Sequence, residues 1–211
     1  RLLWTRTDTD LEAEAVRLAQ EADLSVVVLG LSQRLEGEGG DRKDIALPKV
    51  QTDLLKAIKA QGKPVILVLN AGSALAINWA KDEIDAILSV GYPGEQGGNA
   101  LADVLLGDYN PAGRLPITYY SSLDELPDFE NYDMRERTYR YYSGKPLYPF
   151  GFGLSYTDFS YSNLKSPATV HAGDTLEIAV TVTNTGDRAG DEVVQVYLTD
   201  EKASTPRPQH Q

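Results

Sequence analysis

The chain has 211 residues, a formal net charge of -11 and no cysteine. At roughly 100–200 residues per domain, this length allows one ordinary domain and part of a second. The absence of cysteine excludes disulfide bonds, thiol nucleophiles and cysteine-ligated zinc. It does not fix the compartment, since periplasmic or secreted proteins also occur without cysteine. The acidic charge would repel a phosphate backbone, and no apolar run approaches the roughly 18 residues that cross a bilayer. We therefore expect a soluble protein that binds neither nucleic acid nor membrane.

The first 120 residues alternate between helical and extended patterns. Apolar residues at helical spacing predict a helix at Asp10–Ala22, with Thr9 or Asp10 as its N-cap. Further helices are predicted at about Pro48–Ala60 and Asn99–Leu106. Short apolar runs are typical of strands that are buried on both faces of a parallel sheet. Three such runs occur, at Leu24–Gly30, Val65–Asn70 and Ile84–Val90. A further strand is predicted at Arg114–Tyr119.

This alternation predicts the fold class of residues 1–120. Strands that alternate with helices favour an α/β fold: an open, mainly parallel sheet with flanking helices on both faces, or α/β sandwich. In such sheets, ligands bind at the loops that follow the strands.

Residues 121–158 are rich in Pro, Tyr and Asp and show little helix signal, which predicts an ordered linker. We expect its tyrosines mostly to pack and brace two domains, and a role in sugar stacking is the alternative. These tyrosines are Tyr132, Tyr139, Tyr141, Tyr142, Tyr148 and Tyr156.

From residue 159 onward the apolar pattern has a period of two. Alternation over Leu176–Thr183 and a second run at Glu192–Leu198 predict strands of an antiparallel β-sandwich. About fifty residues leave room for three or so of the roughly seven strands of such a domain. Residues 159–211 are therefore predicted to form an incomplete domain of this type.

The densest set of ionisable residues, Arg34–Arg42, directly follows the first predicted strand. Its glycines would let the loop bring a carboxyl group to a substrate, and a carboxyl group whose pKa is raised by burial can serve as a general acid. The alternative is an ordinary charged surface loop in which Asp41 and Arg42 form local ion pairs.

Several sequence blocks, in this order, resemble the second domain of glycoside hydrolase family 3, and the last part of the chain resembles the fibronectin type III-like domain that many members carry. The blocks are VVVLGLSQRLEGE (26–38) with GDR (40–42), LP (47–48) and Gln51, NAGSAL (70–75) with NWA (78–80), YPG (92–94) with GGNALADVLLGDYNPAGRLP (97–116), and PLYPFGFGLSY (146–156).

The resemblance implies a retaining, exo-acting β-glycosidase that removes a terminal non-reducing β-D-glucosyl or β-D-xylosyl residue. In such enzymes an Asp on a preceding (β/α)₈ barrel is the nucleophile, and a Glu of the following α/β sandwich is the acid/base. That Glu maps best onto Glu38, which lies in a run resembling Gly-Glu-Gly-x-Asp-Arg. Glu36 is the alternative for this role and is otherwise expected to bind substrate.

Glu36 and Glu38 are unsuited to form the whole catalytic pair. The two carboxyl groups of a retaining enzyme lie roughly 5–5.5 Å apart across the sugar. In an extended segment, side chains two residues apart project from one face, roughly 6.5 Å from each other. We therefore expect the nucleophile on an upstream barrel domain of the same polypeptide, which alone takes about 250 residues, and an inactive fragment without it.

The rival hypothesis is a noncatalytic carbohydrate-binding or scaffolding module with the same fold. No cofactor is implied. The two histidines, His171 and His210, are expected in a turn and a frayed tail, so we expect no metal site.

Overall fold

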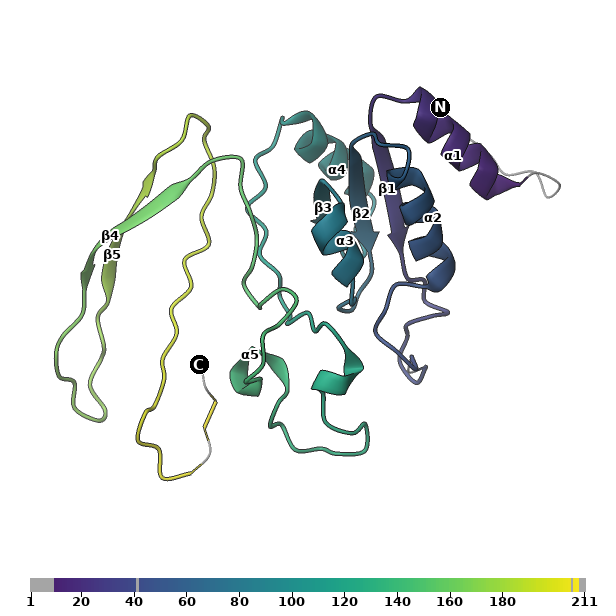
Figure 1. Cartoon of the computed structure of the whole chain (residues 1–211). Helices are drawn as coiled ribbons and strands as arrows, with labels where there is room; N and C mark the ends of the chain where they lie inside the picture. Colours follow the sequence, from purple (N-terminus) through teal and green to yellow (C-terminus); the bar gives the residue numbers. More distant parts are fainter. Residues whose placement is uncertain (1–9, 41, 206, 209–211) are drawn as a thin grey trace.

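A computed structural model describes residues 10–40, 42–205 and 207–208 of the chain (Figure 1). Its helices are α1 (Leu11–Glu21), α2 (Lys49–Lys59), α3 (Asn78–Glu83), α4 (Gly97–Leu106), the 3₁₀ turn η1 (Leu123–Glu125) and α5 (Thr138–Tyr141). Its strands are β1 (Ser25–Gly30), β2 (Val65–Asn70), β3 (Ala86–Ser89), β4 (Phe159–Lys165) and β5 (Ala179–Asn184).

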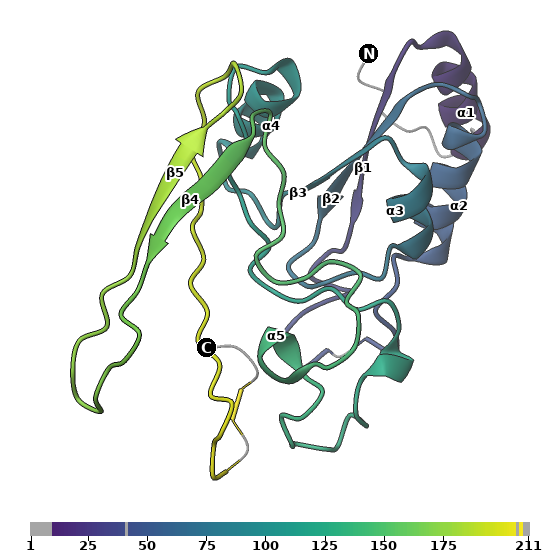
Figure 2. The same ribbon diagram turned by 60° about the vertical axis from the view of Figure 1, so that its left-hand side comes forward.

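The first three strands form a parallel sheet in the order β1-β2-β3. The register pairs Val27 with Leu67 and Leu67 with Ile87, so consecutive strands are also neighbours in space. Figure 2 shows α1, α2 and α3 on one side of this sheet and α4 on the other. The predicted α/β class with a mainly parallel sheet is confirmed.

The core lies between the sheet and the helices α1–α3. Side chains of one face of β2 pack against α2 and α3, and Leu55, Val65 and Leu67 are at most 1% exposed. Burying a side chain of this size stabilises the fold by about 1.5–3 kcal/mol relative to leaving it in water.

The expectation that the first strand is buried on both faces is wrong. Val27 and Leu29 pack against the core, whereas Val26 and Val28 on the opposite face are 44% and 58% exposed. β1 is an edge strand of the described sheet, and α4, the described helix on that side, does not cover its second face. The second predicted strand, β2, is buried or half-buried along its whole length, as expected.

The predicted ends of the helices are largely confirmed. Asp10 is the N-cap of α1, and its Oδ1 accepts a hydrogen bond from the Ala13 amide at 3.1 Å. The other N-cap candidate, Thr9, lies outside the described residues. Helix α4 ends at Gly107, whose φ of 82° is the left-handed conformation that favours glycine at this position.

The strand predicted at Arg114–Tyr119 is not formed. Tyr119 makes an isolated antiparallel bridge with Tyr148, while the Leu115 amide donates to the Phe152 carbonyl at 2.8 Å. Pro116 lies between these two contacts and has no amide hydrogen to continue a ladder. The segment therefore pairs with the linker at separate points.

Three linker tyrosines pack against other aromatic rings, as expected: Tyr139, Tyr142 and Tyr148. Tyr139 stacks on Phe150 with ring centroids 4.1 Å apart, and Tyr142 meets Tyr120 edge-on at 5.1 Å. Burial and a hydrogen bond to Glu125 raise the pKa of Tyr142 to about 12. Tyr132 and Tyr156 depart from this expectation, because they are 95% and 46% exposed.

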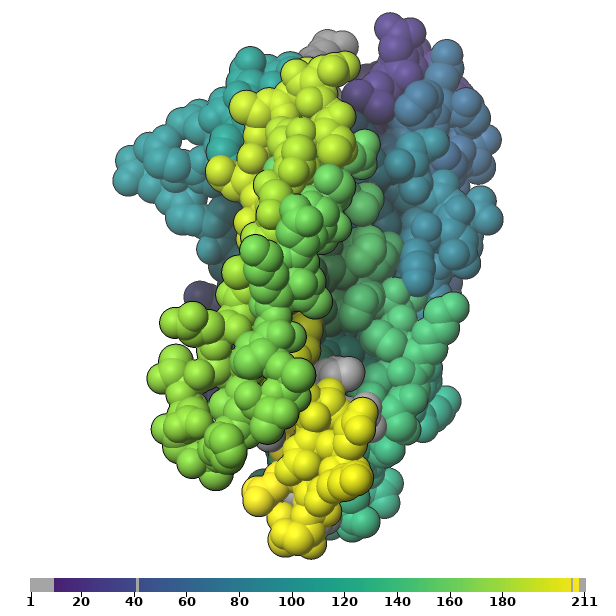
Figure 3. Space-filling model, turned by 90° about the vertical axis from the view of Figure 1, so that its left-hand side faces the viewer, coloured from purple at the N-terminus to yellow at the C-terminus, as the bar shows by residue number. Residues whose placement is uncertain are grey.

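The last part of the chain forms a two-stranded antiparallel sheet of β4 and β5. Figure 3 looks onto this sheet and shows its green and yellow-green residues in front of the α/β region, which is coloured from purple to teal. The strand predicted at Leu176–Thr183 begins later, at Ala179, and the one predicted at Glu192–Leu198 is not formed. That segment uses its side chains, not a backbone ladder, to contact the rest of the chain.

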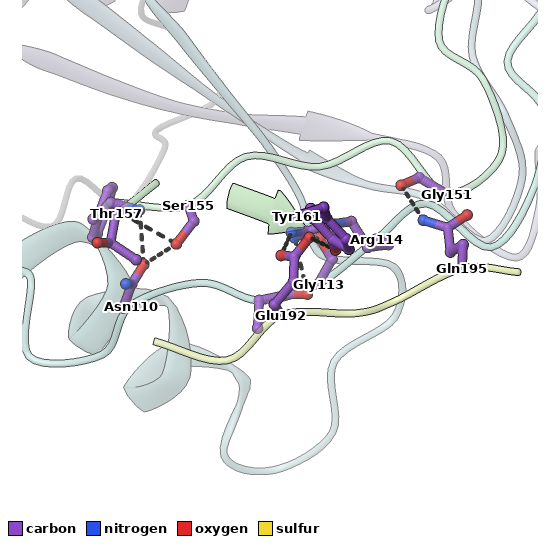
Figure 4. Close-up of polar contacts among 11 residues, drawn as sticks. Asn110, Gly113, Arg114, Gly151, Ser155, Thr157, Tyr161, Glu192 and Gln195 are labelled. Atoms are coloured by element: carbon purple, nitrogen blue, oxygen red, sulfur yellow. Dashed lines mark hydrogen bonds and ion pairs between the residues drawn. The ribbon is translucent and has the colours of Figure 1, made fainter. Parts of the chain in front are cut away.

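Polar side chains join this segment to the preceding parts (Figure 4). Arg114 forms an ion pair with Glu192 at 2.6 Å, and the Tyr161 hydroxyl of β4 donates to the other oxygen of Glu192 at 2.6 Å. Gln195 donates to the Gly151 carbonyl at 2.9 Å. Glu192 thus connects the end of the α/β region to the second sheet.

Candidate active site

The loops after the three parallel strands meet at the carboxyl edge of the sheet. Glu36 follows β1, Gly72 and Ser73 follow β2, and Tyr92 follows β3. The Gly72 amide donates to Glu36 Oε1 at 2.6 Å, and the hydroxyl groups of Ser73 and Tyr92 donate to Oε2 and Oε1. The charged loop therefore lies, as expected, at the edge where ligands bind in parallel sheets.

The carboxyl group of Glu36 is held in its ionised form. Partial burial raises its pKa, but the hydrogen bonds from Ser73, Tyr92 and Gly72 and the charge of Arg42 outweigh this effect and hold the pKa below its usual range. The same contact acts in the opposite sense on the phenol, because a hydrogen bond to the Glu36 carboxylate raises the pKa of Tyr92. Glu36 is therefore a poor proton donor in this arrangement.

Gly72 lets the phenol ring approach Glu36. A Cβ atom at this position would lie 2.8 Å from Cε2 of Tyr92, closer than carbon atoms can pack. Any larger residue would push the ring away from the carboxylate.

Glu38 lies in a tight turn and not in the extended segment that we expected. The Gly40 amide donates to the Gly37 carbonyl at 3.0 Å, which closes a four-residue turn with Glu38 and Gly39 at its tip. Gly39 has a φ of 77°, as the third residue of a type II turn requires. The Glu38 side chain is exposed and has no hydrogen bond or ion pair within the described residues.

Arg42 follows the turn and contacts the loop after β2. Its Nη2 donates to Ser73 Oγ at 3.0 Å and lies 3.3 Å from the Ala74 carbonyl. Asp41, the ion-pair partner considered for it, lies outside the described residues.

Sequence reasoning missed Gly72, Ser73 and Tyr92 as partners of the charged loop. Two signals were available: their position after the second and third predicted strands, and their place in the blocks NAGSAL and YPG that resemble the family. No group of three or more His, Asp or Glu that could hold a metal ion occurs in the described ranges, and His210 lies outside them. None of the described helices is long and apolar enough to cross a membrane.

Residues 5–156 match the Glycosyl hydrolase family 3 C-terminal domain. The chain belongs to this family. It is 45% identical to a xylan 1,4-β-xylosidase of Xylanibacter ruminicola over 86% of its length and 44% identical to a periplasmic β-glucosidase of Salmonella typhimurium over 92%. These matches cover 22% and 27% of the two relatives, so the chain spans about a quarter of their length.

Solved structures of a β-glucosidase and a β-xylosidase share the fold. A β-glucosidase from Erythrobacter marinus superposes with a TM-score of 0.83 at 37% identity, over 99% of this chain and 30% of the other. A family 3 exo-β-xylosidase in complex with a xylobiose aziridine probe superposes with a TM-score of 0.86 at 32% identity, over 98% of this chain and 30% of that one.

Proposed function

We propose that this chain is part of a retaining, exo-acting β-glycosidase that hydrolyses terminal non-reducing β-D-glucosyl or β-D-xylosyl residues of oligosaccharides or aryl glycosides. Family membership and relatives named as β-xylosidase and β-glucosidase support the reaction class. In this proposal Glu38 is the acid/base, as the family resemblance implies.

The different environments of the two glutamates support Glu38, and not Glu36, as the acid/base. Oε1 of Glu36 already accepts two hydrogen bonds from the chain and Oε2 accepts one, which leaves little capacity for a substrate and disfavours protonation. The carboxyl group of Glu38 is free of such bonds in the described chain and lies at the tip of an exposed turn. A bound sugar that covers this turn would desolvate the group, and loss of water favours the protonated form that a general acid needs. Substrate binding by Glu36 stays a prediction.

The second carboxyl group of the pair is proposed to be an Asp on an upstream (β/α)₈ barrel of the same polypeptide. Glu38 would give its proton to the glycosidic oxygen while the Asp attacks the anomeric carbon, and would then take a proton from the water that releases the sugar. This mechanism uses two carboxyl groups and no cofactor.

The test is the Glu38→Gln variant of the full-length parent protein, assayed on aryl β-glucosides and β-xylosides. With poorly activated leaving groups we expect turnover to fall by about 10²–10⁴-fold, the contribution of general acid–base catalysis. Glu83→Gln, an exposed carboxyl group on α3, is the matched control and should retain full activity.

Two outcomes would contradict the proposal. A large loss in Glu36→Gln together with full activity in Glu38→Gln would move the acid/base role to Glu36. A parent protein that binds β-linked oligosaccharides but releases no sugar from either glycoside would instead be the noncatalytic module.

The proposal includes a periplasmic or secreted location, supported by the relative that is named a periplasmic enzyme. Cell fractionation of the source organism checks it, and recovery of the protein in the cytoplasmic fraction would contradict it.

A further inference from the structure

The turn that carries Glu38 is held at both of its ends by one serine. Before the turn, the Ser73 hydroxyl donates to the Glu36 carboxylate. After it, Arg42 Nη2 donates to the same Ser73 oxygen at 3.0 Å. Since Ser73 belongs to the loop after β2, these contacts fasten the loop after β1 to its neighbour at two points.

Between these two points the backbone has little stiffness of its own. Positions 37, 39 and 40 are glycines, which have access to more backbone conformations than any other residue. The 3.0 Å bond from Gly40 to Gly37 sets the shape of the turn, but nothing in it sets where the turn lies relative to the sheet. That placement depends on the contacts made by Glu36 and Arg42.

The loop after β3 contributes a further contact. Tyr92 donates its hydroxyl hydrogen to Glu36 Oε1, and the Gly72 amide donates to the same oxygen at 2.6 Å. Hydrogen bonds to an ionised group are stronger than those between neutral groups. Together these donors, from loops after two different strands, restrict the Glu36 side chain to one position.

We propose that Glu36, Ser73 and Arg42 are positioning residues, which hold the turn so that the carboxyl group of Glu38 reaches the glycosidic oxygen. This inference rests on the proposed function and deepens it. A general acid must lie within about 2.6–3.2 Å of the atom that it protonates. A misplacement of about 1 Å costs on the order of 10²-fold in rate, so the anchoring contacts influence catalysis through the position of Glu38.

The test is Ser73→Ala in the full-length protein, because this change removes both contacts and leaves both glutamates in place. Activity is measured on aryl glycosides whose leaving groups need a proton to different degrees. We expect kcat/KM to fall by about 10–100-fold for phenyl glycosides and to change little for 2,4-dinitrophenyl glycosides, which leave without protonation. Ser73→Thr keeps a hydroxyl group and should restore activity, and Ser162→Ala on β4 is the exposed control.

A double variant shows whether Ser73 acts through Glu38. Once Glu38 is Gln there is no acid to position, so adding Ser73→Ala should cause no further loss. Tyr92→Phe removes a different contact and should show the same dependence on the leaving group, which keeps the inference testable if Ser73→Ala does not fold.

The outcomes separate this inference from the proposed function. Equal losses for all leaving groups, or effects of Ser73→Ala and Glu38→Gln that add, would overturn the positioning role while leaving Glu38 as the acid. Full activity of Glu38→Gln on phenyl glycosides, or no hydrolysis by the parent protein at all, would overturn both.

Discussion

Two glutamates separated by a single glycine have opposite environments in this protein. Glu36 accepts hydrogen bonds from three residues of two neighbouring loops, and Glu38 projects from an exposed turn. A carboxyl group that accepts several hydrogen bonds is stabilised as an anion, whereas a free one keeps its capacity to exchange a proton with a ligand. The chemistry of each residue thus follows from its partners.

The lowered pKa of Glu36 predicts how its contribution to stability depends on pH. Because the folded state favours the ionised form, the contribution is fully present well above the unfolded pKa of about 4.3 and is lost as the pH falls through the lower folded value. The difference in melting temperature between the wild type and Glu36→Gln should therefore be largest near neutral pH and shrink below about pH 4.3. Calorimetry from pH 7 to pH 3 measures it, and a difference that stays constant over this range would contradict the prediction.

At the scale of elements, the end of β1 and helix α2 together place the loop of the candidate site. The Gln51 side chain of α2 accepts from the Gly30 amide and donates to the Gly30 carbonyl, each at 2.8 Å. Gly30 has to be glycine, because a Cβ atom there would lie 1.8 Å from the carbonyl oxygen of Asn70. The last residue of β1, from which the loop that carries both glutamates begins, is therefore fixed against α2 by two hydrogen bonds.

Helix α2 is held against the sheet by the apolar side chains of one of its faces, and two substitutions test this packing. Leu55 is 1% exposed against the sheet, whereas Val50 on the same helix is 72% exposed. Leu55→Ala should lower the local stability of α2 and β2 by about 2–5 kcal/mol, because it leaves a cavity. Val50→Ala should change it by less than about 0.5 kcal/mol. Hydrogen exchange of the amides in both elements measures the effect, and similar protection in the two variants would contradict this packing.

At the scale of the whole molecule, the α/β region and the second sheet are joined by charged and polar side chains. The side chains of Arg114 and Glu192 are 12% and 16% exposed, so this ion pair is shielded from water more than an ordinary surface pair. Tyr156 adds to the junction, since its hydroxyl donates to the Val104 carbonyl of α4 at 2.8 Å. The two-stranded sheet is thus held to its neighbour by specific contacts.

The Glu192→Gln variant tests this junction. It keeps the size of the side chain but leaves the Arg114 guanidinium without its counter-charge, which we expect to weaken the junction by about 1–3 kcal/mol. Amides of β4 and β5 should then exchange faster in the full-length protein while those of β1–β3 stay unchanged. Glu177→Gln, an exposed carboxyl group of the same region, is the control. Unchanged exchange in β4 and β5 would show that other contacts hold the sheet.

Local patterns predicted the elements that depend on nearby residues. The helices α1, α2 and α4, the three parallel strands and the stop at Gly107 follow from periodicity, capping and turn residues within a few positions, whereas α3, η1 and α5 were not predicted. The strands predicted at Arg114–Tyr119 and Glu192–Leu198 failed because a strand also needs a partner ladder. Pro116 interrupts the first, and side-chain contacts replace the ladder in the second.

The sequence by itself determined the α/β class, the family and the loop in which a catalytic carboxyl group is proposed, since each of these depends on residues close together in the chain. Only the tertiary structure decided that Glu36 is bound by Gly72, Ser73 and Tyr92 while Glu38 projects from its turn. These partners lie 36 to 56 residues away along the chain. The parallel sheet brings them together, because it gathers the loops after its strands at one edge.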